Sequence, residues 1–233
     1  MTTADYQHRR GQLQTYFDRT AVEAWARLTS TAPVSKIRAT VREGRERMRA
    51  TLLAYLPAKL DTQTLLDAGC GTGALSVEAA ERGAAVTAID LSSTLIQIAC
   101  HRLPAQLRAG SIDFRVGDMF DPALGTFDHV VAMDSLIHYR RLDVVRVLAG
   151  FAGRTRRSIV FTFAPKTPAL AVMWAVGRLF PRGNRAPAIE PVSERALRRH
   201  IAAEPALHGW RIGRTQRVAS GFYKSQAMEL VKT

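Results

Sequence analysis

The chain has 233 residues, with 33 basic and 20 acidic side chains and a formal net charge of +13. An apolar content of 47% with 16 Gly and 10 Pro is typical of a soluble domain and excludes a fibrous or disordered chain. The basic excess favours anionic partners: nucleic acid, an acidic membrane surface, an acidic protein or a carboxylate-rich substrate.

The cysteines and the N-terminus bear on the cellular compartment. Cys70 and Cys100 form neither a metal-like cluster nor a disulfide framework, so we expect a reducing cytoplasm and no protein-bound metal. The N-terminal residues MTTADYQHRR lack an apolar core, so we expect no secretion signal. The apolar run at residues 169–177 is too short to span a bilayer, which leaves contact with a membrane surface open.

Taken in chain order, two predicted helices precede the main fold, at residues 6–30 and 35–56. Apolar residues recur near helical spacing in the second of these, and Pro57 ends it. Short apolar strands then alternate with helices, which predicts a parallel sheet covered on both faces. The predicted strands are 64–68, 85–90, 112–116, 129–133 and 158–164, and the predicted helices are 73–82, 93–102 and 142–152.

The regular alternation stops at Pro165. Further prolines punctuate the next stretch, which is therefore expected to leave the sheet. The remaining predicted elements are an apolar helix at 169–180, a Gly- and Arg-rich loop at 182–190, a helix at 193–203 capped by Ser193, and an antiparallel pair of edge strands at 210–217 and 226–232.

Residues 65–73, LLDAGCGTG, form a glycine-rich turn between a strand and a helix. Glycines permit positive φ and close approach of the backbone to a ligand at a helix N-terminus. A phosphate-binding loop would end in Gly-Lys-Ser/Thr, and Gly73 is instead followed by Ala74. The spacing of Gly69, Gly71 and Ala74 formally satisfies the dinucleotide pattern. A dinucleotide, S-adenosylmethionine and a turn without a ligand therefore remain open here.

Two acidic residues narrow the choice of cofactor. Asp90 ends the second strand about 20 residues after the turn, where an acid meets ribose hydroxyls; the alternative is a helix cap, which Ser92 could also provide. Asp118 follows the third strand, where methyltransferases place an acid against the adenine amino group, and Met119 or Phe120 would cover the ring. The alternative is a plain turn. Because the chain lacks a second α/β half for a nicotinamide nucleotide, the pattern favours S-adenosylmethionine.

The methionine end of this cofactor carries a carboxylate, which the turn's amides and a basic side chain could meet. Arg38 is the candidate, although it could equally be a solvated helix charge. Tyr16, Phe17 and Trp25 could fold over the site as a lid or pack in the core. The full set of expected cofactor-binding residues is Tyr16, Arg38, Asp67, Gly69, Gly71, Asp90, Leu91, Asp118, Met119 and Met133.

The loop after the fourth strand, DSLIHY at 134–139, lies at the carboxyl edge of the sheet, where ligands bind in open α/β folds. His138 is expected either to position the methyl acceptor or to pack as a satisfied histidine. Methylation of exocyclic base amines usually uses an Asn- or Asp-Pro-Pro-aromatic motif here, and cytosine C5 chemistry needs a suitably placed cysteine. The chain has neither, so we expect no nucleic-acid substrate.

An arginine-rich segment follows an apolar one near the C-terminal third of the chain. Such an arrangement suits a flat hydrophobic substrate with carboxylate arms, an anionic membrane or an acidic partner, and its alternative is a solvated run of charge. The residues are Met173, Trp174, Leu179 and Phe180 with Arg178, Arg182, Arg185, Arg195, Arg198 and Arg199.

The motifs YF(D)…EAW, SKIRATVREG, LLDAGCGTG, AIDLS, GDMFD, DSLIHY, FTFAPKTP and GFYKSQAMELV resemble, in this order, the magnesium-protoporphyrin IX O-methyltransferases of (bacterio)chlorophyll biosynthesis. The resemblance implies a Rossmann-like class I methyltransferase fold, an α/β structure with a mostly parallel seven-stranded sheet flanked by helices. It also implies an N-terminal helical lid segment at 1–56 and a methyltransferase domain at 57–233. A small cap insertion after the fifth strand, at about 166–191, would cover the porphyrin.

The resemblance further implies methylation of a porphyrin propionate, giving the monomethyl ester and S-adenosylhomocysteine. The porphyrin would arrive from the large, porphyrin-carrying subunit of magnesium chelatase, and His138 would lie at the acceptor. Relatives from oxygenic phototrophs carry Trp-x-x-Ile-Tyr-Gly in the first region. Thr29 stands at the place of that tyrosine, so the tyrosine's role is not carried over intact. His138 and Thr29 are thus the candidate catalytic residues.

A propionate acceptor fits simple chemistry, because its pKa resembles that of Glu, about 4.3, and it is ionised at neutral pH. It needs orientation and not a general base, so His138 would act as a hydrogen-bond donor. The main rival is an O-methyltransferase of another small molecule, such as a quinone precursor or a phenolic acid. A second rival is an RNA- or protein-binding module that retains the fold, which the +13 charge permits.

Overall fold

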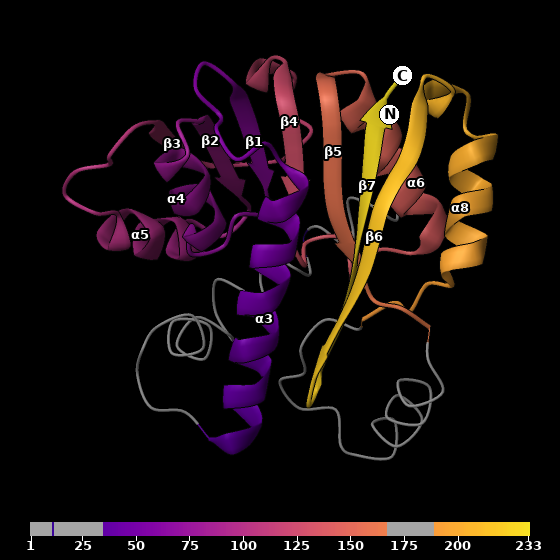
Figure 1. The fold of residues 1–233 in the computed structure, drawn as a ribbon, viewed down its shortest axis with the longest axis horizontal. Coiled ribbons are helices and arrows are strands. Elements are labelled where there is room, and N and C mark those ends of the chain that lie inside the picture. Colours follow the sequence, from indigo (N-terminus) through magenta and orange to yellow (C-terminus); the bar gives the residue numbers. More distant parts are fainter. Residues whose placement is uncertain (1–10, 12–34, 167–188) are drawn as a thin grey trace.

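A seven-stranded sheet in the order β3-β2-β1-β4-β5-β7-β6 is the centre of the computed structural model, which describes residues 11, 35–166 and 189–233 (Figure 1). The first five strands are parallel, and β7 pairs antiparallel with both β5 and β6. The strands are β1 Thr64–Ala68, β2 Ala85–Asp90, β3 Ser111–Val116, β4 Phe127–Ala132, β5 Thr155–Phe163, β6 Trp210–Ser220 and β7 Tyr223–Lys232.

Helices cover both faces of this sheet. One buried cluster joins α3 and α4 to the sheet, and the other joins it to α6 and α8, while α5 packs beside β2 and β3. The α-helices are α3 Lys36–Tyr55, α4 Ala74–Glu81, α5 Ser93–Arg102, α6 Arg141–Ala152 and α8 Glu194–Ala203, and the 3₁₀ helices are η2 Pro122–Leu124 and η3 Pro205–Leu207.

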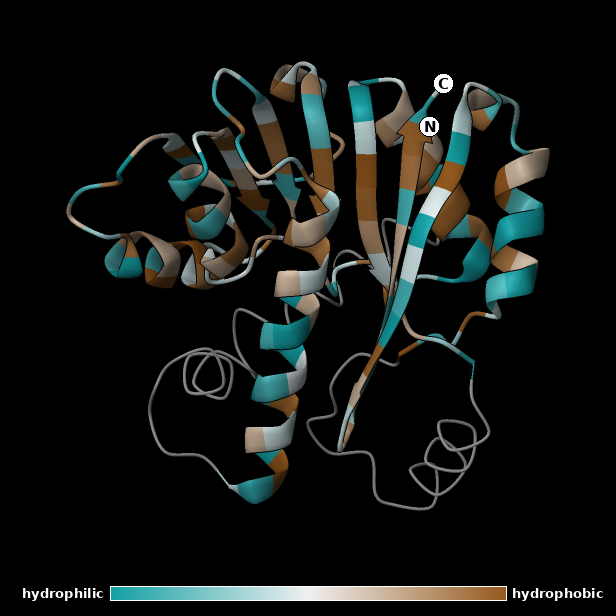
Figure 2. Cartoon of the chain, viewed as in Figure 1, coloured by the Kyte–Doolittle hydropathy of each residue, from teal (hydrophilic) through white to brown (hydrophobic). Residues whose placement is uncertain are grey.

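The predicted α/β alternation is confirmed, and the differences lie at the ends of elements. β5 begins at Thr155, before the predicted residue 158, because its first residues extend beside the start of β4. The predicted C-terminal strands do form an antiparallel pair, but they are longer and meet in a tight turn at 221–222. Of the two strands only β6 is an edge, which explains why its residues are more hydrophilic than those of the inner strand β5 (Figure 2).

Helix α3 is capped by its own side chain at its start and is anchored to the sheet at its end. At its start the Ser35 hydroxyl accepts a hydrogen bond from the Arg38 N–H (3.4 Å), as expected of an N-cap. At its end the Arg214 guanidinium of β6 donates to the carbonyls of Ala54 (2.9 Å) and Tyr55 and pairs with Glu229 of β7 (2.7 Å). A cation at a helix C-terminus satisfies carbonyls that have no partner within the helix.

The carboxyl ends of the parallel strands meet at one edge of the sheet, and the loops that the sequence singles out follow them there. Three predictions fall outside the described residues: the helix at 6–30, the helix at 169–180 and most of the loop at 182–190. The division at residue 56 and the cap at about 166–191 stay predictions.

Candidate active site

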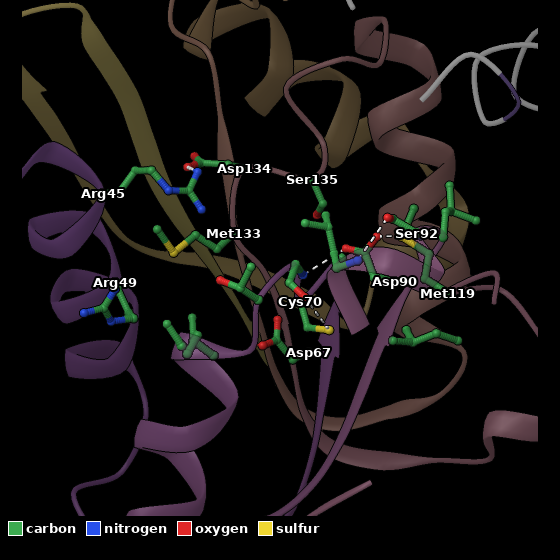
Figure 3. Close-up of a pocket in the computed structure, with 18 of the residues that line it drawn as sticks. Arg45, Arg49, Asp67, Cys70, Asp90, Ser92, Met119, Met133, Asp134 and Ser135 are labelled. Carbon is green, nitrogen blue, oxygen red and sulfur yellow. Dashed lines mark hydrogen bonds and ion pairs between the residues drawn. The ribbon is translucent and has the colours of Figure 1, made fainter. Parts of the chain in front are cut away.

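A cavity of about 480 Å³ opens at the carboxyl edge of the sheet. It is bounded by the loops that follow β1, β2, β3 and β4 and by one side of α3, as Figure 3 shows. Its lining contains most of the predicted cofactor residues: Asp67, Gly69, Gly71, Asp90, Leu91, Asp118, Met119 and Met133, together with His138.

The glycine turn adopts the backbone that its sequence predicts. Gly69, Gly71 and Gly73 have φ values of 82°, 56° and 77°, a region that side chains with a Cβ rarely enter. The N–H groups of Gly69 and Cys70 donate to the Ile89 carbonyl at 2.8 and 3.1 Å, which ties the turn to β2. Helix α4 starts at the end of the turn without a side-chain cap, so the positive end of its dipole borders the cavity.

Asp67 is fully buried beneath the turn. Its Oδ2 accepts a hydrogen bond from the Ser76 hydroxyl at 2.6 Å. Burial raises the pKa of Asp67 to about 7, with a smaller contribution from the charge of Asp90 and against the effect of the Ser76 hydrogen bond. This carboxyl group therefore changes its protonation near neutral pH.

Asp90 joins the end of β2 to the glycine turn. Its Oδ2 accepts from the Gly71 N–H and its Oδ1 from the Ser92 N–H, both at 2.9 Å. The cap of α5 is Ser92, whose hydroxyl accepts from the Leu95 N–H at 3.2 Å. Asp90 is thus not the helix cap of the alternative interpretation. An ionised carboxylate accepts up to about four hydrogen bonds, so it can also hold a hydroxyl in the cavity.

The segment that follows β3 forms the part of the cavity wall next to Asp90. Asp118 accepts a hydrogen bond from the Phe120 N–H at 3.0 Å, which folds this segment into a turn, and both Asp118 and Met119 line the cavity. The Phe120 ring instead stacks on Phe151, 5.6 Å away between centroids. Between the two apolar residues that the sequence offered, Met119 is the one that faces the cavity.

The loop after β4 carries His138, which is buried and lines the cavity. The loop is closed by a hydrogen bond from the Tyr139 N–H to the Leu136 carbonyl (3.1 Å). The Glu190 N–H donates to the Ile137 carbonyl (2.9 Å), so this loop is joined to the last residues of the predicted cap segment.

Asp134 is a central residue that the sequence reasoning missed. Its carboxylate is buried and accepts hydrogen bonds from Arg45 (2.6 Å), Tyr223 (3.0 and 3.1 Å), Ser225 (3.2 Å) and Thr162 (3.2 Å). Burial, followed by the Asp134 charge, raises the pKa of the Tyr223 hydroxyl well above its ordinary value, so it stays a neutral donor. Tyr223 and Ser225 belong to the GFYKSQ motif, which was the available signal, although its partner could not be deduced.

The arginines of α3 that line the cavity do not include the predicted Arg38. Arg38 is exposed near the start of α3 and does not line the cavity. Arg42, Arg45 and Arg49 do, on successive turns of the same helix, and Arg49 pairs with Glu78 of α4. The sequence reveals a basic helix, but how far the helix reaches past the sheet edge decides which arginines border the site.

Several predicted residues lie outside the described part of the chain: Tyr16, Phe17, Trp25, Thr29 and the residues singled out between 173 and 185. Arg198 on α8 pairs with Glu194 at 2.8 Å. Among the described residues, no group of three or more His, Cys, Asp or Glu side chains could hold a metal ion. The described helices also include none of the length and apolarity needed to cross a bilayer.

Comparisons with known proteins agree on one family. The family model "Magnesium-protoporphyrin IX methyltransferase C-terminus" matches residues 132–232, and "Methyltransferase domain" matches residues 65–157. The magnesium-protoporphyrin O-methyltransferase of Rhodobacter capsulatus is 52% identical over 97% of this chain and 98% of its own length. The chain belongs to the magnesium-protoporphyrin O-methyltransferase family.

Other members of the magnesium-protoporphyrin O-methyltransferase family match over nearly the whole chain. The chloroplastic enzyme of Arabidopsis thaliana is 30% identical over 93% of this chain and 69% of its own length. The crystal structure of the Synechocystis enzyme with bound SAH superimposes with a TM-score of 0.84 at 28% identity, covering 96% of this chain and all of that one. The predicted family and its class I methyltransferase fold are confirmed.

Proposed function

We propose that this chain transfers the methyl group of S-adenosylmethionine to a propionate carboxylate of magnesium-protoporphyrin IX. The observation that carries the proposal is the 52% identity to the Rhodobacter capsulatus enzyme over 97% of the chain. Protoporphyrin IX has oxygen atoms only in its two propionate groups, so an O-methyltransferase acting on it forms an ester. The products are the monomethyl ester and S-adenosylhomocysteine, as a step of bacteriochlorophyll synthesis.

The described side of the cavity suits S-adenosylmethionine, which supplies an electrophilic methyl group on a sulfonium. Asp90, Asp118 and Met119 all line the cavity, and we assign Asp90 to the ribose hydroxyls, Asp118 to the adenine amino group and Met119 to the face of the ring. The amides of the glycine turn and the positive end of α4 suit the methionine carboxylate. We assign the basic partner of that carboxylate to Arg42 and Arg49, two arginines of α3 that line the cavity, in place of Arg38.

The acceptor needs orientation more than activation. A propionate is already ionised, with a pKa of about 4.3, so we assign His138 the role of a hydrogen-bond donor that aims it. Holding the reacting atoms in place can lower the barrier by about 7–11 kcal/mol. Excluding water strengthens the attraction between carboxylate and sulfonium. The N-terminal lid with Tyr16 and Thr29, and the cap at about 166–191, would provide this exclusion.

The surroundings of the enzyme follow from its substrate and charge. We propose a cytoplasmic protein that receives its porphyrin from the large subunit of magnesium chelatase and touches the inner or photosynthetic membrane peripherally. The net charge of +13 supports contact with an acidic protein or an anionic lipid surface. Co-sedimentation with anionic and neutral vesicles, and with the chelatase subunit, separates these two contacts.

A quinone precursor is the second candidate substrate, because a ubiquinone biosynthesis O-methyltransferase of Xanthomonas oryzae is 37% identical over 142 residues. That match covers 57% of this chain and 59% of the other, whereas the porphyrin family matches nearly the whole chain. The two acceptors differ in pH dependence. A phenol with a pKa near 10 gives a rate that rises with pH, whereas a carboxylate gives little change between about pH 6 and 8 at saturating cofactor.

The deciding experiment offers the enzyme labelled methyl donor with four acceptors. These are magnesium-protoporphyrin, metal-free protoporphyrin, magnesium-protoporphyrin dimethyl ester and a catechol-type quinone precursor. We expect label in an ester of the first, none in the dimethyl ester, which has no free carboxylate, and none in the catechol. Label in the catechol alone, or in neither free porphyrin, would contradict the proposed function.

A further inference from the structure

Ser135, in the loop between Asp134 and His138, has a buried hydroxyl without a partner. Its Oγ is one of two buried side-chain polar atoms in the described part of the chain that make no hydrogen bond. A buried hydroxyl that gives up water without finding a partner costs stability. Such an atom at the edge of a cavity indicates a partner that arrives with a ligand.

The absence of a side chain at Gly69 leaves room for Ser135. Ser135 lines the cavity and points toward the side on which Asp90 and Cys70 lie (Figure 3). A Cβ on Gly69 would stand only 2.4 Å from the Ser135 Cβ and 3.2 Å from its Oγ. The first glycine of the turn therefore admits Ser135 against the cofactor side of the cavity.

The backbone before Ser135 is held in an unusual conformation. Asp134 has a φ of 55°, which a residue with a Cβ adopts rarely and at a cost. Its N–H donates to the Thr162 hydroxyl at 2.7 Å, and its carboxylate accepts from side chains of α3, β5 and β7. These bonds fix the direction in which the next residue leaves the strand.

From this geometry we propose that the Ser135 hydroxyl donates a hydrogen bond to a ligand carboxylate, and that Asp134 is the positioning residue that aims it. The inference rests on the proposed function, which brings two carboxylates into this cavity: that of the cofactor's methionine and that of the propionate. A serine has one χ angle with three staggered positions, so its hydroxyl can turn to a carboxylate as it binds. As a neutral donor it needs no change of protonation.

Two substitutions separate the hydrogen bond from the shape of the side chain. Ser135→Ala removes the hydroxyl, and Ser135→Cys keeps a similar shape with a weak donor. A hydrogen bond to a charged group corresponds to about a 10- to 100-fold effect. We expect both variants to show a loss of about tenfold or more in either S-adenosylhomocysteine affinity or kcat/KM for the porphyrin. The melting temperature of the ligand-free protein should stay equal or rise.

Calorimetry and ester formation identify which carboxylate is involved. If it is the cofactor's, Ser135→Ala weakens S-adenosylhomocysteine but leaves unchanged the affinity for 5′-methylthioadenosine, which lacks the carboxylate. If it is the propionate, both nucleoside affinities are kept and kcat/KM for magnesium-protoporphyrin falls. Either result supports the proposal. If wild type forms no ester, the proposed function fails, and the comparison of the two nucleosides alone decides the role of Ser135.

The matched control is Ser158→Ala. Ser158 is also a buried serine, but its hydroxyl is bonded to His129 at 2.7 Å, at the opposite end of the sheet. This variant should melt at a lower temperature and keep its kinetics, the reverse of Ser135→Ala. The proposal is overturned if Ser135→Ala changes neither S-adenosylhomocysteine affinity nor kcat/KM for magnesium-protoporphyrin by more than twofold, or if Ser135→Cys keeps the wild-type values of both.

Discussion

The two sides of the cavity are built in different ways. On the cofactor side the bonds are local, since Gly71 meets Asp90 across 19 positions of the sequence and Asp67 meets Ser76 across 9. On the acceptor side Asp134 is bonded to residues 89 and 91 positions away. A local turn keeps its geometry wherever its short segment folds, whereas the acceptor side exists only when α3, β4, β5 and β7 are all in place. Substitutions on the two sides should therefore fail differently.

The largest effect is expected at the glycine turn. Gly69→Ala places a Cβ at a φ of 82° and within 2.4 Å of Ser135, and the left-handed backbone alone costs about 1–2 kcal/mol. We expect more than a 100-fold loss of S-adenosylhomocysteine affinity by calorimetry. Gly125→Ala is the control, because Gly125 has a φ of 77° and nothing within 4 Å of its added Cβ. Equal cofactor affinity in Gly69→Ala and wild type would refute the assignment.

The second prediction, for His138→Ala, tests whether the acceptor side can be impaired without weakening cofactor binding. His138→Ala should lower ester formation about 10- to 100-fold, as for a lost hydrogen bond to a charged group, with cofactor affinity nearly unchanged. His138 is buried beside the cavity, and we assign it to the acceptor. Steady-state rates and calorimetry on one preparation give both numbers. An equal loss of S-adenosylhomocysteine affinity would move His138 to the cofactor side.

The third prediction concerns the long-range network itself. Tyr223→Phe removes one donor to Asp134, and a hydrogen bond to a charged group contributes about 1.5–3 kcal/mol. We expect the free energy of unfolding to fall by that amount and kcat/KM for the porphyrin to fall several-fold, with cofactor affinity kept. Denaturant titration and kinetics measure these changes. Tyr55→Phe, on α3 outside the network, is the control.

If Tyr223→Phe instead weakened S-adenosylhomocysteine as strongly as it slowed ester formation, the two sides of the cavity would be one cooperative unit. The close packing of Tyr223 on α3 makes this a fair test. A Cβ on Gly44 would stand 2.5 Å from the Tyr223 ring, so the ring is held and only its hydroxyl is altered.

The same contrast explains what the sequence could predict. The strands, the helices and the residues from Asp67 to Met119 were identifiable because each lies in a short segment with its own periodicity and turn residues. Arg45 and Asp134 were not identified, because their meeting depends on where α3 crosses the sheet edge. The charge pattern of α3 predicts Arg38, whereas only the tertiary placement of the helix favours Arg42, Arg45 and Arg49.

The smallest effect concerns Asp67, whose burial raises its pKa to about 7. The folded protein then binds a proton more tightly than the unfolded chain, so this group's contribution is fully present below the unfolded pKa of about 4 and is lost as pH rises through 7. Between pH 6 and 8 the contribution of Asp67 to the free energy of unfolding should fall by about 1 kcal/mol.

Asp67→Asn should remove this slope in denaturant titrations at pH 6, 7 and 8, because the amide does not titrate. Asp61→Asn, at an exposed position, should keep it. A slope of the same size in Asp67→Asn would place the titrating group elsewhere and refute the assignment to Asp67.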